Sequence, residues 1–74
     1  MILLGKTLTV TASTERGLIG LRGTVIEDGR DIVRIRTSDG SEKLLVKQTI
    51  TVTVDDRELG PAELKGTHVQ RLKR

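Results

Sequence analysis

Aromatic residues and cysteine are both absent from this sequence. Without Phe, Tyr or Trp, the aliphatic side chains must fill the interior, and the bases of a nucleic acid have no ring to stack on. This excludes the binding mode of RNA-recognition-motif domains. The lack of cysteine excludes disulfides and thiolate metal sites, and it fits a reducing cytoplasmic compartment.

Long apolar segments are missing as well. Residues 1–4 are apolar, but Gly5 and Lys6 follow at once, so this stretch is far too short for a signal peptide or a spanning helix. The sequence therefore predicts a soluble, cytoplasmic protein with no membrane partner. A chain of 74 residues makes one domain, residues 1–74, and leaves no room for a separate catalytic domain.

Residues suited to catalysis are scarce. His68 is the single histidine, and a nucleophile needs a base beside it, so we interpret His68 as an exposed residue near a helix start and expect no nuclease activity from the chain alone. The acidic pairs Glu27-Asp28 and Asp55-Asp56 could hold Mg²⁺, but both fall in expected turns, where Asp bonds to the backbone. We therefore predict no metal or cofactor bound by this chain.

Alternating apolar and polar residues predict an all-β domain. In the first expected strand Leu8, Val10 and Ala12 share one face, and threonines occupy the other. The short strands and their spacing are typical of a small Sm-like or SH3-like antiparallel barrel of about six strands. The expected strands cover residues 6–12, 20–27, 32–37, 42–47, 49–54 and 57–59.

Glycine marks the turns and bends of this barrel. One tight turn is expected at residues 28–31, and Asp39-Gly40 should supply a positive φ for a second hairpin. Gly20 and Gly23 lie inside an expected strand, which indicates a bulge, a bend or a close approach of two backbones.

The C-terminal part predicts helix. Gly60-Pro61 ends the sheet, and Pro61 precedes a possible helical turn at residues 62–64. Thr67 and Gln70 match a capping box, so we expect a separate final short helix that begins at Thr67 and closes one end of the barrel.

The net charge of +3 and a pI near 9.8 favour a polyanionic partner. Arg34 and Arg36 alternate with apolar residues and should share one face, near Lys43 and Lys47 of the next strand. This face is either an ordinary solvated surface with acidic neighbours or a stripe that contacts phosphates. A second basic set, which either solubilises the terminus or lies on RNA, comprises Lys65, Arg71, Lys73 and Arg74.

Two apolar stretches have open roles. Residues 1–4 and Leu18-Ile19 either plug the end of the barrel or face a protein partner.

Order and spacing of residues across nearly the whole chain resemble the archaeal ribonuclease P protein component 1 family, which is related to eukaryotic Pop4 and Rpp29. The family's apolar-Gly approach, its G-x-V strand, its turn with an arginine, its D-G turn with E-K and its closing basic residues all have counterparts here. These counterparts are Leu3-Leu4-Gly5-Lys6, Leu18-Ile19-Gly20, residues 23–35, Asp39-Gly40, Glu42-Lys43, Lys47, Gly66 and residues 71–74. The sequence departs from the family at the turn Asp28-Gly29-Arg30-Asp31, at Val46 and at residues 50–54.

The resemblance implies a non-catalytic protein subunit of ribonuclease P, in which the RNA removes the 5′ leader of precursor tRNA with Mg²⁺. It implies the ribonuclease P RNA and an Rpp21-like zinc-ribbon subunit as partners, precursor tRNA as an indirect partner, and a monomer when the chain is alone. Arg30 matches the family's turn arginine, and Arg71 matches its closing basic motif. The candidate RNA-binding residues are Arg22, Arg30, Arg34, Arg36, Lys43, Lys47, Lys65, Arg71, Lys73 and Arg74.

Two other classes stay open at this point. An Sm-like or KOW-type barrel of a ribosomal or other ribonucleoprotein complex would share the charge and the strands. A protein-binding SH3-like module would share the fold, although such modules usually bind Pro-rich peptides in aromatic grooves.

Overall fold

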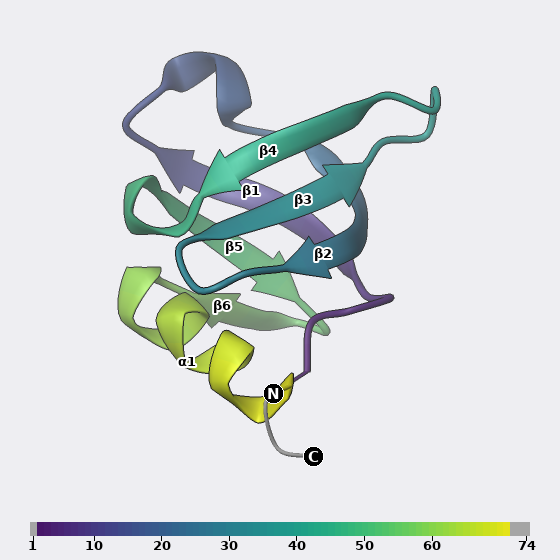
Figure 1. Ribbon diagram of the computed structural model, residues 1–74. Coiled ribbons are helices and arrows are strands. Elements are labelled where there is room, and N and C mark those ends of the chain that lie inside the picture. Colours follow the sequence, from purple (N-terminus) through teal and green to yellow (C-terminus); the bar gives the residue numbers. More distant parts are fainter. Residues whose placement is uncertain (1, 72–74) are drawn as a thin grey trace.

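The computed structural model describes residues 2–71, with only the backbone at positions 68–71. Within these residues, six strands, two short 3₁₀ turns and one helix follow one another (Figure 1). The elements are β1 (Thr7–Ser13), η1 (Arg16–Leu18), β2 (Arg22–Asp28), β3 (Ile32–Arg36), β4 (Glu42–Val46), η2 (Lys47–Thr49), β5 (Ile50–Val54), β6 (Arg57–Leu59) and α1 (Pro61–Arg71).

The strands form one antiparallel sheet in the order β4-β3-β2-β1-β5-β6. The sheet bends strongly, so β4, β3 and β2 lie in front of β1 and β5 in Figure 1. The predicted small all-β, barrel-like fold with a short C-terminal helix is thereby confirmed. Within residues 2–71 no helix has the length and apolar character needed to cross a bilayer.

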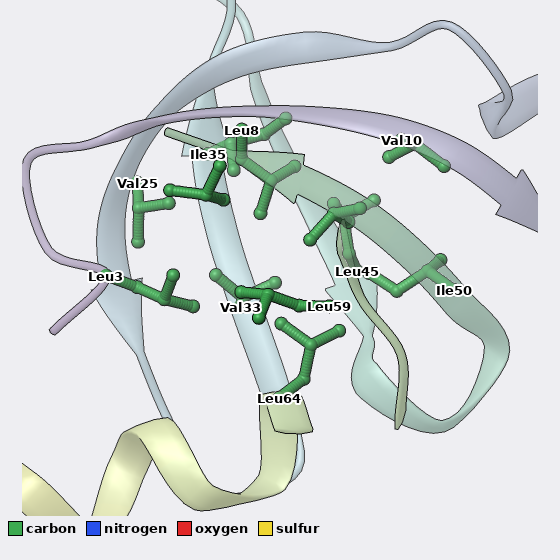
Figure 2. Packing of buried hydrophobic residues seen from close by; sticks show 12 residues of the cluster. Leu3, Leu8, Val10, Val25, Val33, Ile35, Leu45, Ile50, Leu59 and Leu64 are labelled. Carbon is green, nitrogen blue, oxygen red and sulfur yellow. The ribbon is translucent and has the colours of Figure 1, made fainter. Parts of the chain in front are cut away.

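Period-two alternation places the core between the two layers of the bent sheet. In β3 and β5 the alternate residues Val33, Ile35, Ile50, Val52 and Val54 are buried, as the sequence pattern predicts. Figure 2 shows Val33, Ile35 and Ile50 converging with leucines from several other parts of the chain. The remaining core residues are Leu3, Leu8, Val10, Val25, Leu45, Leu59 and Leu64.

Two bulges interrupt this alternation. The pairing of β1 with β5 shifts between Val10 and Ala12, so Ala12 is exposed and its predicted place beside Leu8 and Val10 is wrong. The pairing of β2 with β3 shifts between Val25 and Glu27, so the next inward residue is Asp28. A regular strand would have turned Glu27 inward instead.

Glycine acts as predicted at two places. Gly40 has a φ of +90°, which the hairpin between β3 and β4 requires. A Cβ at Gly23 would lie 2.6 Å from the Arg36 carbonyl oxygen, so this strand position needs glycine because two backbones approach closely. Gly20, with a φ of +92°, precedes β2 and does not lie inside it.

Helix α1 is one continuous element, and the predicted division into a turn and a separate final helix is wrong. Pro61 takes the first helical position, and the Gly60 backbone N–H donates to the Glu63 carboxylate at 3.0 Å, which caps the helix start. Leu64 points into the core toward Val33 and Leu59 (Figure 2). With Leu64 buried in the core, the helix continues past Gly66. Thr67 therefore lies inside the helix and does not cap its start.

Candidate nucleic-acid interface

The outer face of the sheet carries rows of threonine and arginine. Directly paired residues of antiparallel strands project to the same side, so the register builds these rows across the strands. One row runs from Thr53 of β5 through Thr9 of β1 to Arg22 of β2. The next row runs from Thr7 of β1 through Thr24 of β2 and Arg36 of β3 to Glu42 of β4.

A groove of about 560 Å³ lies across this face, and we call it the Thr/Arg groove. Among the residues that the structure describes, its lining presents two guanidinium groups and four hydroxyls but no carboxylate. The lining residues are Thr7, Arg22, Gly23, Thr24, Ile26, Arg36, Thr37 and Ser38. Arg22 makes no ion pair with any residue of the described part of the chain, so its charge is available to an external anion.

The β3–β4 hairpin forms one rim of the groove, through Thr37 and Ser38. The hydroxyl of Thr37 donates to the Asp39 carboxylate, and the Ser41 backbone N–H donates to the same carboxylate at 3.0 Å. These hydrogen bonds stabilise the charged form and lower the pKa of Asp39 from 3.8 to about 2. Asp39 therefore accepts both hydrogen bonds as a carboxylate at neutral pH.

A second hollow of about 480 Å³ adjoins the groove and shares Thr7 and Arg22 with it. Its charges are mixed, because the Lys6 ammonium lies 2.8 Å from the Asp55 carboxylate, and Asp56 also lines this hollow. This hollow is less suited to an anion than the Thr/Arg groove.

Arg34 and Arg36 share one face, as predicted, but carboxylates surround them. Arg34 Nε lies 2.9 Å from Glu27 Oε1, and an Arg36 terminal nitrogen lies 2.9 Å from Glu42 Oε2. Arg34 also reaches Glu42 at 4.0 Å. The acidic neighbours that one of the two alternatives expects are therefore present beside both arginines.

The predicted positions of Lys43 and Lys47 beside these arginines are wrong. Lys43 pairs with Ile35, which faces inward, whereas Arg34 pairs with Leu44 on the outer face. Lys43 therefore projects from the edge strand β4 on the side of the sheet opposite to Arg34. Lys47 is completely buried, because it continues the inward set of Leu45 beyond the end of the strand. Neither lysine joins a stripe with Arg34 and Arg36.

Lys47 instead joins the β2–β3 turn to the helix. Its ammonium lies 2.6 Å from Asp28 Oδ1 and donates to the Gly29 carbonyl at 2.7 Å and to the Thr67 hydroxyl at 3.1 Å. The Thr67 hydroxyl in turn donates to the Leu64 carbonyl at 2.8 Å. Buried charges persist only when they are paired and hydrogen-bonded, as they are here.

The other predicted basic residues are spread over the molecule. Arg30 projects from the β2–β3 turn with a side chain that is 78% exposed, and its nearest carboxylate, on Asp31, is 3.5 Å away. Lys65 is exposed on α1. The side chain of Arg71, as well as Lys73 and Arg74, lies outside the described residues, and so does the side chain of His68.

The two acidic pairs do not converge as metal ligands would. Asp28 is buried against Lys47 while Glu27 faces outward to Arg34. Asp55 and Asp56 form the β5–β6 turn with φ values of 53° and 65°, as the turn prediction requires. Among described residues, no group of three or more possible side-chain metal ligands comes together.

The apolar stretches are partly buried and partly exposed. Leu3 is buried in the core and Leu18 packs against it, whereas Ile2, Leu4 and Ile19 are exposed. Leu44 and Val46 on the edge strand β4 are also exposed. The sequence does not predict this, because residues 44–46 are all apolar and show no alternation. Sequence reasoning also missed the groove hydroxyls, although the threonine alternation in β1 marks that face.

The fold and its outer face define a small, basic, barrel-like protein with a cationic, hydroxyl-rich groove. Comparison of the sequence with known families gives a match to ribonuclease P/MRP, subunit p29, over residues 2–73. The chain belongs to this family of ribonuclease P protein subunits, as the resemblance predicted.

The sequence also aligns with that of a curated relative. It is the ribonuclease P protein component 1 of Methanococcus aeolicus (strain ATCC BAA-1280 / DSM 17508 / OCM 812 / Nankai-3), with 30% identity over 50 residues. The alignment covers 68% of this chain and 52% of the relative. The chain thus spans about half the length of the curated relative it matches.

Proposed function

We propose that this chain is a non-catalytic subunit of ribonuclease P that binds the ribonuclease P RNA and supports 5′-leader removal from precursor tRNA. Family membership over residues 2–73 carries the proposal. The cationic groove and the net charge of +3 support it, because phosphate contacts supply most of the non-specific affinity for nucleic acids.

The rest of the assembly is part of the same proposal. The ribonuclease P RNA supplies the catalytic centre with Mg²⁺, precursor tRNA is an indirect partner, and an Rpp21-like zinc-ribbon subunit is the protein partner. The chain alone is a cytoplasmic monomer without nuclease activity.

Reconstitution tests this proposal. The chain is added to an archaeal ribonuclease P RNA and the other protein subunits, and cleavage of precursor tRNA is compared with and without it. The rate at limiting Mg²⁺ should rise when the chain is present, and highly purified chain alone should cleave nothing. Equal rates with and without the chain would contradict the proposal, as would cleavage by the chain alone.

Salt dependence separates RNA binding from protein binding. If phosphates dominate, the logarithm of the RNA affinity should fall with the logarithm of the salt concentration by about 0.7 to 0.9 per neutralised phosphate. A flat dependence would indicate that the protein subunit is the main partner. Light scattering on the chain alone should give the mass of a monomer, whereas an Sm-like ring would give a multiple of it.

A further inference from the structure

We infer that the Thr/Arg groove is the site where this chain binds the RNA backbone, and that Arg22 and Arg36 both contact the phosphates of one short segment there. The inference rests on the proposed function and adds the place and the mode of binding. It adds the outer face of β1, β2 and β3 to the turn tip and the chain end, where the sequence already places candidate contacts.

Charge and shape favour a phosphate in this groove. Both arginines line the same hollow of about 560 Å³, and no carboxylate of the described part of the chain belongs to its lining. An arginine fork can bind phosphate oxygens through two parallel hydrogen bonds. The hydroxyls of Thr7, Thr24 and Ser38 can donate further hydrogen bonds, which suits a chain of phosphates and sugars.

Arg22 is ready for this role without rearrangement. It is exposed, makes no ion pair within the described part of the chain, and stands where the groove meets the neighbouring hollow. An anion at Arg22 therefore displaces solvent and no protein carboxylate.

Arg36 can turn to the phosphate because Glu42 has a second arginine beside it. Glu42 Oε2 lies 2.9 Å from Arg36, while its Oε1 is 4.0 Å from Arg34. When Arg36 moves to a phosphate, a small movement lets Glu42 pair fully with Arg34. The carboxylate thus stays paired, and Glu42 acts as a competitor that sets the affinity of the groove.

The groove offers no means of reading bases. It contains no aromatic ring on which a base could stack, and its polar groups suit phosphate and sugar oxygens. Binding here should be independent of sequence, and the shape of the folded RNA should determine where the groove docks.

The test compares four variants with the wild type in equilibrium binding to ribonuclease P RNA at several salt concentrations. Arg22→Ala and Arg36→Ala should each weaken binding about tenfold and reduce the salt slope by about 1. Glu42→Gln should strengthen binding, because Arg36 loses its competitor. Arg57→Ala is the matched control: it removes the same charge from exposed strand β6, which β1 and β5 separate from β2.

Two further measurements keep the outcome interpretable. Thermal melting curves of all variants should superimpose on that of the wild type, because the changed side chains are exposed. The side-chain Nε–H signals of Arg22 and Arg36 should shift in NMR spectra on addition of ribonuclease P RNA, and also on addition of a short poly(U) of unrelated sequence.

The outcomes distinguish the groove from the proposed function. If the wild type binds ribonuclease P RNA but Arg22→Ala and Arg36→Ala behave like Arg57→Ala, the groove inference is overturned and the proposed function stands. If poly(U) shifts Arg22 and Arg36 but ribonuclease P RNA does not bind, the groove is a phosphate site and the proposed function is overturned. Failure of both RNAs to bind would overturn both.

Discussion

The ammonium of Lys47 lies 2.6 Å from the carboxylate of Asp28, and both side chains are excluded from solvent. Through this ion pair the end of β2, the turn that carries Arg30 and helix α1 share one set of contacts. Lys47 therefore connects these three segments from inside the fold, with its side chain fully buried.

Replacing Lys47 with alanine should destabilise the fold by about 3 to 5 kcal/mol, because the change leaves the Asp28 carboxylate buried without its counter-charge. Lys43→Ala is the matched control, since it removes an exposed lysine from the neighbouring strand, and it should change stability by less than about 0.5 kcal/mol. Urea unfolding of both variants measures the difference. Equal stability of the two variants would show that the buried pair does not stabilise the fold.

Two glycine substitutions should have opposite effects. Gly23→Ala should destabilise the fold by about 1 to 3 kcal/mol, because the added Cβ would meet the Arg36 carbonyl oxygen at 2.6 Å. Gly66→Ala should stabilise it by about 0.5 to 1 kcal/mol, because a Cβ there meets nothing within 4 Å and alanine favours helix. Calorimetric melts check both, and a stable Gly23→Ala variant would mean that β2 and β3 can separate without cost.

Arg30→Ala should leave stability within about 0.5 kcal/mol of the wild type, because the side chain projects into solvent from the turn. It should still weaken assembly with the RNA or the partner subunit, and we expect the same of Arg71→Ala. Thermal melts and reconstituted cleavage of precursor tRNA measure the two effects. Normal cleavage by both variants would place the functional surface elsewhere, and the Thr/Arg groove would be the remaining candidate.

The pKa of Asp39 gives a pH test of the β3–β4 hairpin. Folding lowers this pKa from 3.8 to about 2. The stability that the ionised Asp39 carboxylate contributes is therefore fully present above pH 3.8 and is lost as the pH falls through about 2. Titration of the Asp39 carboxyl signal by NMR should show the low value in the wild type. In Thr37→Val the pKa should rise toward 3.8, and an unchanged value would show that the Thr37 hydroxyl is not the main cause.

Local sequence determined most of the secondary structure. Alternation in β3 and β5, the positive φ at Gly40, the turn at Asp55-Asp56 and the helix start at Pro61 each depend on residues close together in the chain. Such features follow from steric limits and from the burial of every second side chain. The resemblance to the family was also visible in the sequence, in the order and spacing of motifs such as Leu18-Ile19-Gly20, Asp39-Gly40 and Glu42-Lys43.

Tertiary structure alone decided which charged groups are inside and which are paired. The bulge between Val25 and Glu27 arises from the pairing of β2 with β3, and it turns Asp28 inward to meet Lys47, a residue 19 positions later. Likewise, Leu64 is buried in a core that distant strands form, and α1 continues past Gly66. Periodicity within one segment does not encode these choices, because each depends on the energy of contacts between segments that are far apart in the chain.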